Sequence, residues 1–261
     1  LDAIDKAFVL EPDAEITMEA NPNDLTLAYL KMVRAIGVNR LSIGMQSASA
    51  EDLQLFERRH DAQSVIDSVR DARRAGFDNL SLDLIYGAPG QSLERWRHTL
   101  EAALALEPEH LSLYALSLEA GTPMRAAVET GHLPTPDDDL AADMYELASE
   151  MLGARGFGQY EISNWALPGR QSRHNLQYWL NAPYLGFGPG AHGFAGGVRY
   201  SVLLSPQRYI RALAGGAAGK FDYPLSPAVA ESTQVGRDQE ISETLIMGMR
   251  LIGRGIDRRE F

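Results

Sequence analysis

Polar residues with distinct chemistry interrupt or follow apolar stretches in the first third of the sequence. Glu19 closes "EITME", Gln46 follows "RLSIGM", and Asp83 lies within "LSLDLIY". Arg58 comes shortly after the second of these stretches. Carboxylates accept hydrogen bonds from ribose hydroxyls, an amide donates and accepts, and a guanidinium binds a carboxylate through two parallel bonds. The set therefore suits a ligand that carries both hydroxyl groups and a carboxylate.

Two other interpretations of these residues stay open at this point. Each residue taken alone is more commonly a turn residue that satisfies loop backbone, and the set would also suit a barrel enzyme acting on a sugar phosphate. The stretch "GAPGQS" lacks the glycine spacing of a phosphate-binding loop, which counts against the second interpretation. His98 and His110 have no acidic neighbours at useful spacing, so we predict that both lie on the surface.

A second group of chemically capable side chains is the run "HNLQYW". If this run is helical, His174 and Tyr178 share one face, and Asn175 and Trp179 share another. One interpretation is a packed aromatic corner with the imidazole bonded to backbone. The other is an axial haem ligand between aromatic walls, favoured by the glycine-rich stretch "LGFGPGAHGF", where backbone could approach a flat ligand closely.

The elements that position these residues follow an alternating pattern as far as about residue 117. Strand-like runs begin near 15, 40, 79 and 110, and each gap between them holds a stretch with helical spacing. Such βαβ units form parallel sheets, whose binding residues gather at the carboxyl ends of the strands. Four units suit part of a β/α barrel or a doubly wound sheet. The rhythm changes near 120–135, where we expect a boundary.

Composition narrows the class of protein. The net charge of −11, without a basic stripe, argues against nucleic-acid binding. No apolar run reaches the length of a membrane span, so the cytoplasm is the expected location. The chain has no cysteine, which leaves no disulfides and no thiolate ligands for a metal. It begins within a helical pattern and ends directly after another, so we expect a fragment of a longer protein.

Several motifs together resemble one known family. The runs "EANP", "GVNRLSIGMQS", "RRH", "DLIYGAPGQS" and "YEISNWALPG" occur in order, followed by "HNLQYW". They resemble the radical S-adenosylmethionine (radical SAM) proteins of the coproporphyrinogen III oxidase group. Within it the chain is most similar to the HemW-type haem chaperones, whose hallmark is HNxxYW.

The resemblance implies a partial (β/α) barrel of the radical SAM type, with its first strands missing, over 1–130. A smaller α+β region, which also continues the barrel, would occupy 131–261. S-adenosylmethionine would contact Glu19, Gln46, Arg58 and Asp83, and haem would contact His174, Asn175, Tyr178 and Trp179. The implied function is haem binding and transfer to acceptor proteins, with membrane-associated acceptors as one option. The alternative is an oxygen-independent coproporphyrinogen III dehydrogenase.

Two departures from the family pattern matter. The family's CxxxCxxC motif, which ligates a [4Fe–4S] cluster, and its GGTP motif are both absent, which a truncated chain or a degenerate relative would explain. Without cluster thiolates we expect no radical chemistry from this chain. In addition, Glu57 stands where the family usually has glycine, and its carboxylate could compete for Arg58.

Overall fold

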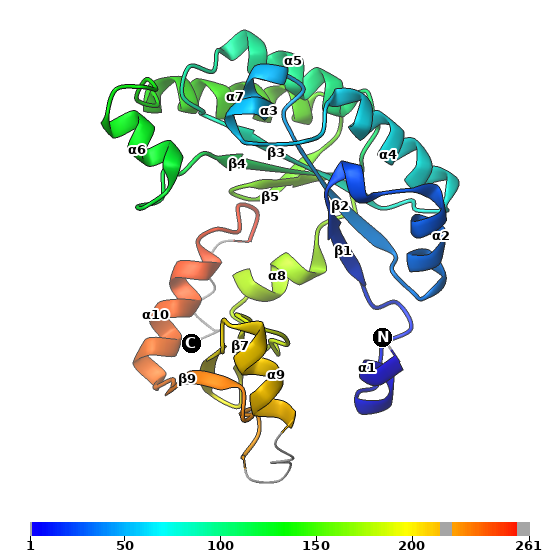
Figure 1. Ribbon diagram of the computed structural model, residues 1–261, viewed down its shortest axis with the longest axis vertical. Helices are drawn as coiled ribbons and strands as arrows, with labels where there is room; N and C mark the ends of the chain where they lie inside the picture. Colours follow the sequence, from blue (N-terminus) through cyan, green and yellow to red (C-terminus); the bar gives the residue numbers. More distant parts are fainter. Residues whose placement is uncertain (1, 215–220, 255–261) are drawn as a thin grey trace. The chain divides into compact units, whose positions relative to one another are not determined.

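The computed structural model describes residues 2–214 and 221–254, which form two compact units. Unit 1 is Leu1–Gln171 and unit 2 is Ser172–Phe261. Figure 1 shows both units, coloured along the chain. None of the helices in the described ranges combines the length and the apolar composition that crossing a bilayer requires.

Unit 1 is built on a six-stranded sheet, and four of its strands are those expected from the sequence. In spatial order the strands are β1 (Thr17–Ala20), β2 (Arg40–Gln46), β3 (Leu80–Tyr86), β4 (His110–Ala115), β6 (Asn164–Ala166) and β5 (Gly158–Glu161). β1 to β4 are parallel, whereas β6 and β5 are antiparallel to their neighbours. The predicted α/β class with a largely parallel sheet is confirmed.

Helices connect the parallel strands and cover one face of the sheet (Figure 1). In chain order the helices of unit 1 are α1 (Asp2–Ala7), the 3-10 turn η1 (Pro22–Asp24), α2 (Leu27–Ala35), α3 (Ala50–Leu55), α4 (Ala62–Arg74), α5 (Leu93–Leu104), α6 (Pro123–Glu129) and α7 (Asp138–Gly153). Side-chain oxygens of Thr26, Asp61 and Ser92 cap the first turns of α2, α4 and α5.

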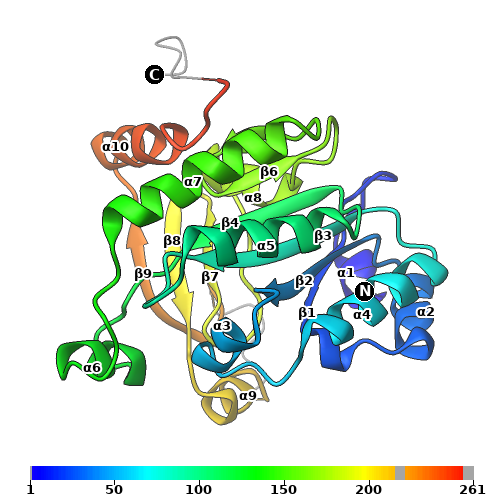
Figure 2. The same ribbon diagram turned by 90° about the horizontal axis from the view of Figure 1, so that it is seen from above.

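The two faces of the sheet differ in chemistry because side chains alternate along each strand. Leu41, Leu82 and Leu111 on neighbouring strands are fully buried in the core that the helices cover. The buried Trp96 donates its indole N–H to the carbonyl of Met144, which ties α5 to α7, and these helices pack together (Figures 1 and 2). The opposite face of the sheet carries polar side chains instead.

His110 shows that the opposite face is buried as well, and its predicted surface position is wrong. The imidazole is 0% exposed and contacts the hydroxyls of Ser81 and Tyr160, each at 2.8 Å. Burial holds the pKa of His110 well below its ordinary value, and the nearby charge of Arg40 acts in the same direction. The exposed position predicted for His98 agrees with the structure.

Unit 2 is a small α+β unit. Its antiparallel sheet consists of β7 (His192–Ala195), β8 (Val198–Val202) and β9 (Val229–Gln234). Its helices are α8 (Arg173–Trp179), α9 (Pro206–Ala214) and α10 (Arg237–Gly248). A small core forms around Tyr200, Val202 and Ala228.

The structure divides the chain further along than the sequence boundary at residue 130. The helix α7 and the strands β5 and β6 belong to unit 1, where the two strands extend the sheet beyond β4. The run "QYEISNWA" has the alternating pattern of a single strand, but the structure forms the β5–β6 hairpin there, in which Gln159 pairs with Trp165. A tight turn between two short strands has the same alternating pattern as one longer strand, so periodicity did not separate them.

Candidate functional site

Neighbouring parallel strands bring three of the predicted ligand residues together. Asp83 lies in the middle of β3, where Ser42 Oγ contacts both of its carboxylate oxygens, at 3.0 and 3.1 Å. Burial raises the pKa of Asp83, hydrogen bonds from Ser112 and Ser42 oppose that rise, and the charge of Glu19 adds to it. Glu19 pairs with Ser42 in the β1–β2 register, and Ser42 contacts Asp83, so the two carboxylates lie on the same face of the sheet.

Gln46 completes this group through an unusual backbone conformation. A register shift separates Ile43 from Gln46 on β2, and Gln46 has a φ of 64°, in the left-handed region that few non-glycine residues adopt. The side chain turns back over Gly44, where a Cβ atom would lie 2.7 Å from Gln46 Nε2 and 3.9 Å from the carbonyl oxygen of Ala20. The glycine of "GMQS" thus makes room for the amide beside the end of β1.

Arg58 lies in the loop between α3 and α4 and lines a polar cavity. The cavity measures about 270 Å3, and its lining residues are Asn21, Asn23, Asp24, Glu57, Arg58, Arg59 and His60. Among the described residues, no ion pair joins Arg58 to Glu57, which lines the same cavity. An exposed guanidinium beside the end of β1 can receive a carboxylate.

The neighbouring polar residues were not predicted. Ser42 and Ser112 flank Asp83 from the adjacent strands, and Tyr114, whose pKa burial raises, is also close enough to feel the Asp83 charge. Arg40 is 3% exposed, and its Nε has no hydrogen-bond partner among the described residues. The sequence signal that could have identified these residues is a polar side chain at every second position of an otherwise apolar strand.

The "HNLQYW" run forms α8, as the shared faces require. Ser172 caps the helix, accepting a hydrogen bond from the backbone N–H of Asn175 at 3.2 Å. The exposed His174 ring lies edge-on to Tyr178, with centroids 4.8 Å apart, and Tyr178 lies edge-on to Tyr184 at 4.6 Å. An imidazole at the outer end of an aromatic row can bind a metal whose macrocycle lies against the rings.

Trp179 takes part in packing within unit 2. The Arg250 guanidinium lies 4.2 Å from the centre of its ring, and α8 packs against α10. The indole Nε1 is buried and has no hydrogen-bond partner among the described residues. His174 is exposed, whereas Tyr178 and Trp179 are half-buried and the Arg250 guanidinium covers one ring face of Trp179.

Glycines near this helix have an internal role that the sequence interpretation missed. A Cβ on Gly186 would lie 2.0 Å from the carbonyl oxygen of His192, and one on Gly193 would lie 2.1 Å from the ring of Tyr200. The Tyr200 hydroxyl also accepts a hydrogen bond from the Gly186 N–H at 3.0 Å. These two glycines allow close packing inside unit 2, so they are not evidence for a flat ligand.

The sequence of this chain is similar to those of known proteins. A model described as "Radical SAM superfamily" matches residues 1–103. The chain is 38% identical over 256 residues to "Heme chaperone HemW" of Bacillus subtilis, covering 97% of this chain and 65% of that protein. It is 39% identical over 251 residues to the protein of the same name from Mycobacterium tuberculosis (strain H37Rv), covering 96% and 62%. It thus spans less than two thirds of these relatives' length.

A solved structure resembles this chain over most of its length. "Coproporphyrinogen III oxidase (HemN) from Escherichia coli is a Radical SAM enzyme" aligns with a TM-score of 0.79 and 23% sequence identity. The alignment covers 96% of this chain and 58% of that chain. At this level of identity, the similarity shows the fold alone.

Proposed function

The chain belongs to the HemW group of the radical SAM superfamily, and from that membership we propose that it is part of a chaperone that binds S-adenosylmethionine and carries haem. Transfer of haem to acceptor proteins and a cytoplasmic location belong to the same proposal. The observation that supports this proposal is that each unit contains its own group of candidate ligand-binding residues. Each set fits one of the two ligands by its own chemistry.

The set in unit 1 fits S-adenosylmethionine. The ribose of this molecule offers two neighbouring hydroxyls, which the carboxylates of Asp83 and Glu19 can accept, and the Gln46 amide can donate as well as accept. The methionyl carboxylate matches the guanidinium of Arg58. Two carboxylates in one site also favour a ligand that bears a positive sulfonium.

The chain's residues do not fit a [4Fe–4S] cluster. Such clusters are held by cysteine thiolates, and the sequence has none. In the part of the chain that the structure describes, no group of three or more histidine, aspartate or glutamate side chains could replace them. We therefore assign this chain binding of S-adenosylmethionine but no step of its cleavage.

The set in unit 2 fits haem as cargo. His174 is exposed at the end of a row that continues through Tyr178 and Tyr184, so an imidazole and flat apolar surface lie side by side. Imidazole is a common axial ligand of haem iron, and tilted aromatic contacts stabilise a porphyrin edge. Accessibility of the ring suits a cargo that must be released. For the dehydrogenase alternative, the likeness to the E. coli oxidase supports only the fold.

Haem titration of the intact protein tests the cargo assignment. Replacing His174 with alanine should shift the Soret band and weaken haem binding by about tenfold, a loss of about 1.4 kcal/mol, because the iron loses its axial nitrogen. His98→Ala is the matched control, since His98 is also exposed but lies on α5 in unit 1. An unchanged Soret band and affinity in His174→Ala would remove the haem site from α8.

A glycine substitution tests the S-adenosylmethionine assignment without changing a ligand residue. In Gly44→Ala the new Cβ would lie 2.7 Å from Gln46 Nε2, so the amide must move away and the affinity should fall by about tenfold. Isothermal titration calorimetry measures the change. The control is Gly158→Ala in β5, where the nearest atom to the new Cβ is 3.9 Å away. Equal affinities in both variants would contradict the placement of Gln46 in the site.

A further inference from the structure

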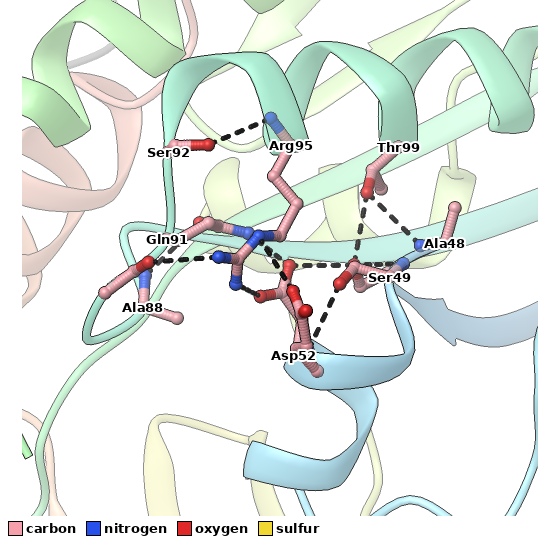
Figure 3. Close-up of polar contacts among 11 residues, drawn as sticks. Ala48, Ser49, Asp52, Ala88, Gln91, Ser92, Arg95 and Thr99 are labelled. Carbon is pink, nitrogen blue, oxygen red and sulfur yellow. Dashed lines mark hydrogen bonds and ion pairs between the residues drawn. The ribbon is translucent and has the colours of Figure 1, made fainter.

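A buried carboxylate behind the end of β2 is the centre of a polar network that the proposed site does not include (Figure 3). Asp52, on α3, is 1% exposed. Its Oδ2 accepts from Ser47 Oγ and from Gln91 Nε2, both at 2.9 Å, and its Oδ1 accepts from Arg95 Nη1 at 2.9 Å. Three donors from three segments thus converge on one carboxylate, and buried charges of this kind are stable only when so paired.

The network joins the two loops that border the site. Gln91 accepts the backbone N–H of Ala88 at 3.3 Å, and Arg95 donates to the carbonyl of Gly90 at 3.3 Å, so the loop after β3 is tied to Asp52. Thr99 Oγ1 lies 3.1 Å from Ser47 Oγ and accepts the N–H of Ala48 at 3.2 Å. Figure 3 shows these contacts between the start of α5 and the start of α3.

Ser47 is the point at which this network reaches the ligand residues, because it directly follows Gln46. On the other side of Gln46, the carbonyl of Met45 contacts Nε2 of His60 at 3.0 Å and accepts the N–H of Ser47 at 2.8 Å. Both neighbours of Gln46 are therefore fixed. A left-handed backbone is unfavourable for a non-glycine residue and persists only where its surroundings enforce it.

We propose that Asp52 is a positioning residue for S-adenosylmethionine binding, acting through Ser47 to hold Gln46 in its left-handed conformation. This inference rests on the proposed function, in which Gln46 contacts that ligand. With Ser47 anchored, the Gln46 amide stays folded over Gly44. Without the anchor, the backbone relaxes to an ordinary strand conformation and a strand residue points its side chain elsewhere.

A double-mutant cycle on the intact protein separates positioning from simple stabilisation. S-adenosylmethionine affinity is measured by calorimetry for wild type, Ser47→Ala, Gln46→Ala and the double variant, and for Asp52→Asn. Ser47→Ala leaves the Asp52–Arg95 ion pair in place, so it remains informative if Asp52→Asn fails to fold. We expect Ser47→Ala and Asp52→Asn each to weaken binding by about five- to tenfold, and Ser47→Ala to have less than a twofold effect once Gln46 is alanine.

The control is Leu152→Ala, which removes a fully buried side chain from α7 and lowers stability without touching the network. Its affinity should equal that of wild type at a temperature where both are folded. Affinity losses that add in the double variant, or an unchanged affinity in Ser47→Ala, overturn the inference while the proposed function stands. A wild-type protein that does not bind S-adenosylmethionine, or a Gln46→Ala variant that binds normally, overturns the S-adenosylmethionine assignment and this inference with it.

Discussion

At the scale of single residues, Asp83, which we propose as a ribose ligand, carries a stability cost in the folded chain. The side chain is largely withdrawn from water, and burial raises its pKa although Ser42 and Ser112 donate to it. A raised carboxyl pKa in the folded state means that the ionised form opposes folding. The hydroxyls of a bound ribose would add further hydrogen bonds to this carboxylate.

Asp83→Asn should therefore stabilise the unliganded protein at neutral pH. Below the ordinary aspartate pKa of about 3.9, Asp83 is protonated in both folded and unfolded chains, so the variant gains little there. As the pH rises through the higher folded pKa, the wild type loses stability and the neutral amide does not. The melting temperatures of the two proteins should diverge between pH 4 and pH 8. A constant difference over that range would contradict the pKa shift; Asp137→Asn, at an exposed helix cap, serves as the comparison.

The sequence pattern predicts some residues of the candidate site and of the Asp52 network but not others. Glu19 and Asp83 could be predicted because carboxylates on neighbouring apolar strands of a parallel sheet lie near one another. The backbone of Gln46 could not, since a register shift leaves no trace in residue type. The Asp52 network could not either, because its donors come from segments that only the folded chain brings together.

At the scale of elements, β7 and β8 depend on one glycine. The ring of Tyr200 lies where a Cβ on Gly193 would stand, and Tyr200 belongs to the small core of unit 2. We expect Gly193→Ala to lower the free energy of unfolding of unit 2 by about 1–3 kcal/mol through overpacking. Urea denaturation followed by tyrosine and tryptophan fluorescence measures this.

The matched substitution is Gly248→Ala at the end of α10, where no atom lies within 4 Å of the new Cβ. It should leave the urea midpoint unchanged or raise it slightly, because alanine favours a helix. A Gly193→Ala midpoint equal to that of Gly248→Ala would show that Tyr200 can move aside.

Periodicity predicted the parallel strands and their helices because each long element has a clear repeat of two or 3.6 residues. The antiparallel strands were harder to predict from the sequence. β5 and β6 have four and three residues, too few for a repeat to separate them from one longer strand. In unit 2 the same glycines that could signal a ligand site instead admit close contacts across the β7–β8 sheet.

At the scale of the whole molecule, the two units have cores of very different size. The core of unit 1 joins apolar side chains of β1 to β4 and of β6 to those of the helices, whereas the core of unit 2 centres on Tyr200, Val202 and Ala228. We therefore expect unfolding in more than one step, with unit 2 lost at the lower temperature. Calorimetry of Tyr200→Ala and Leu152→Ala checks this: the first should lower the earlier transition only, and the second the later one. A single transition that both variants shift equally would contradict it.

The position of β1 at the edge of the sheet affects how this chain can associate with other chains. It lies at the end of the sheet order, paired with β2 on one side, and no strand of the described residues pairs with its other side. A free strand edge presents unpaired backbone groups that can template the addition of a strand from another molecule, the first step of aggregation. A charge on such an edge resists that addition, so we expect the exposed carboxylate of Glu19 to limit association of chains through β1.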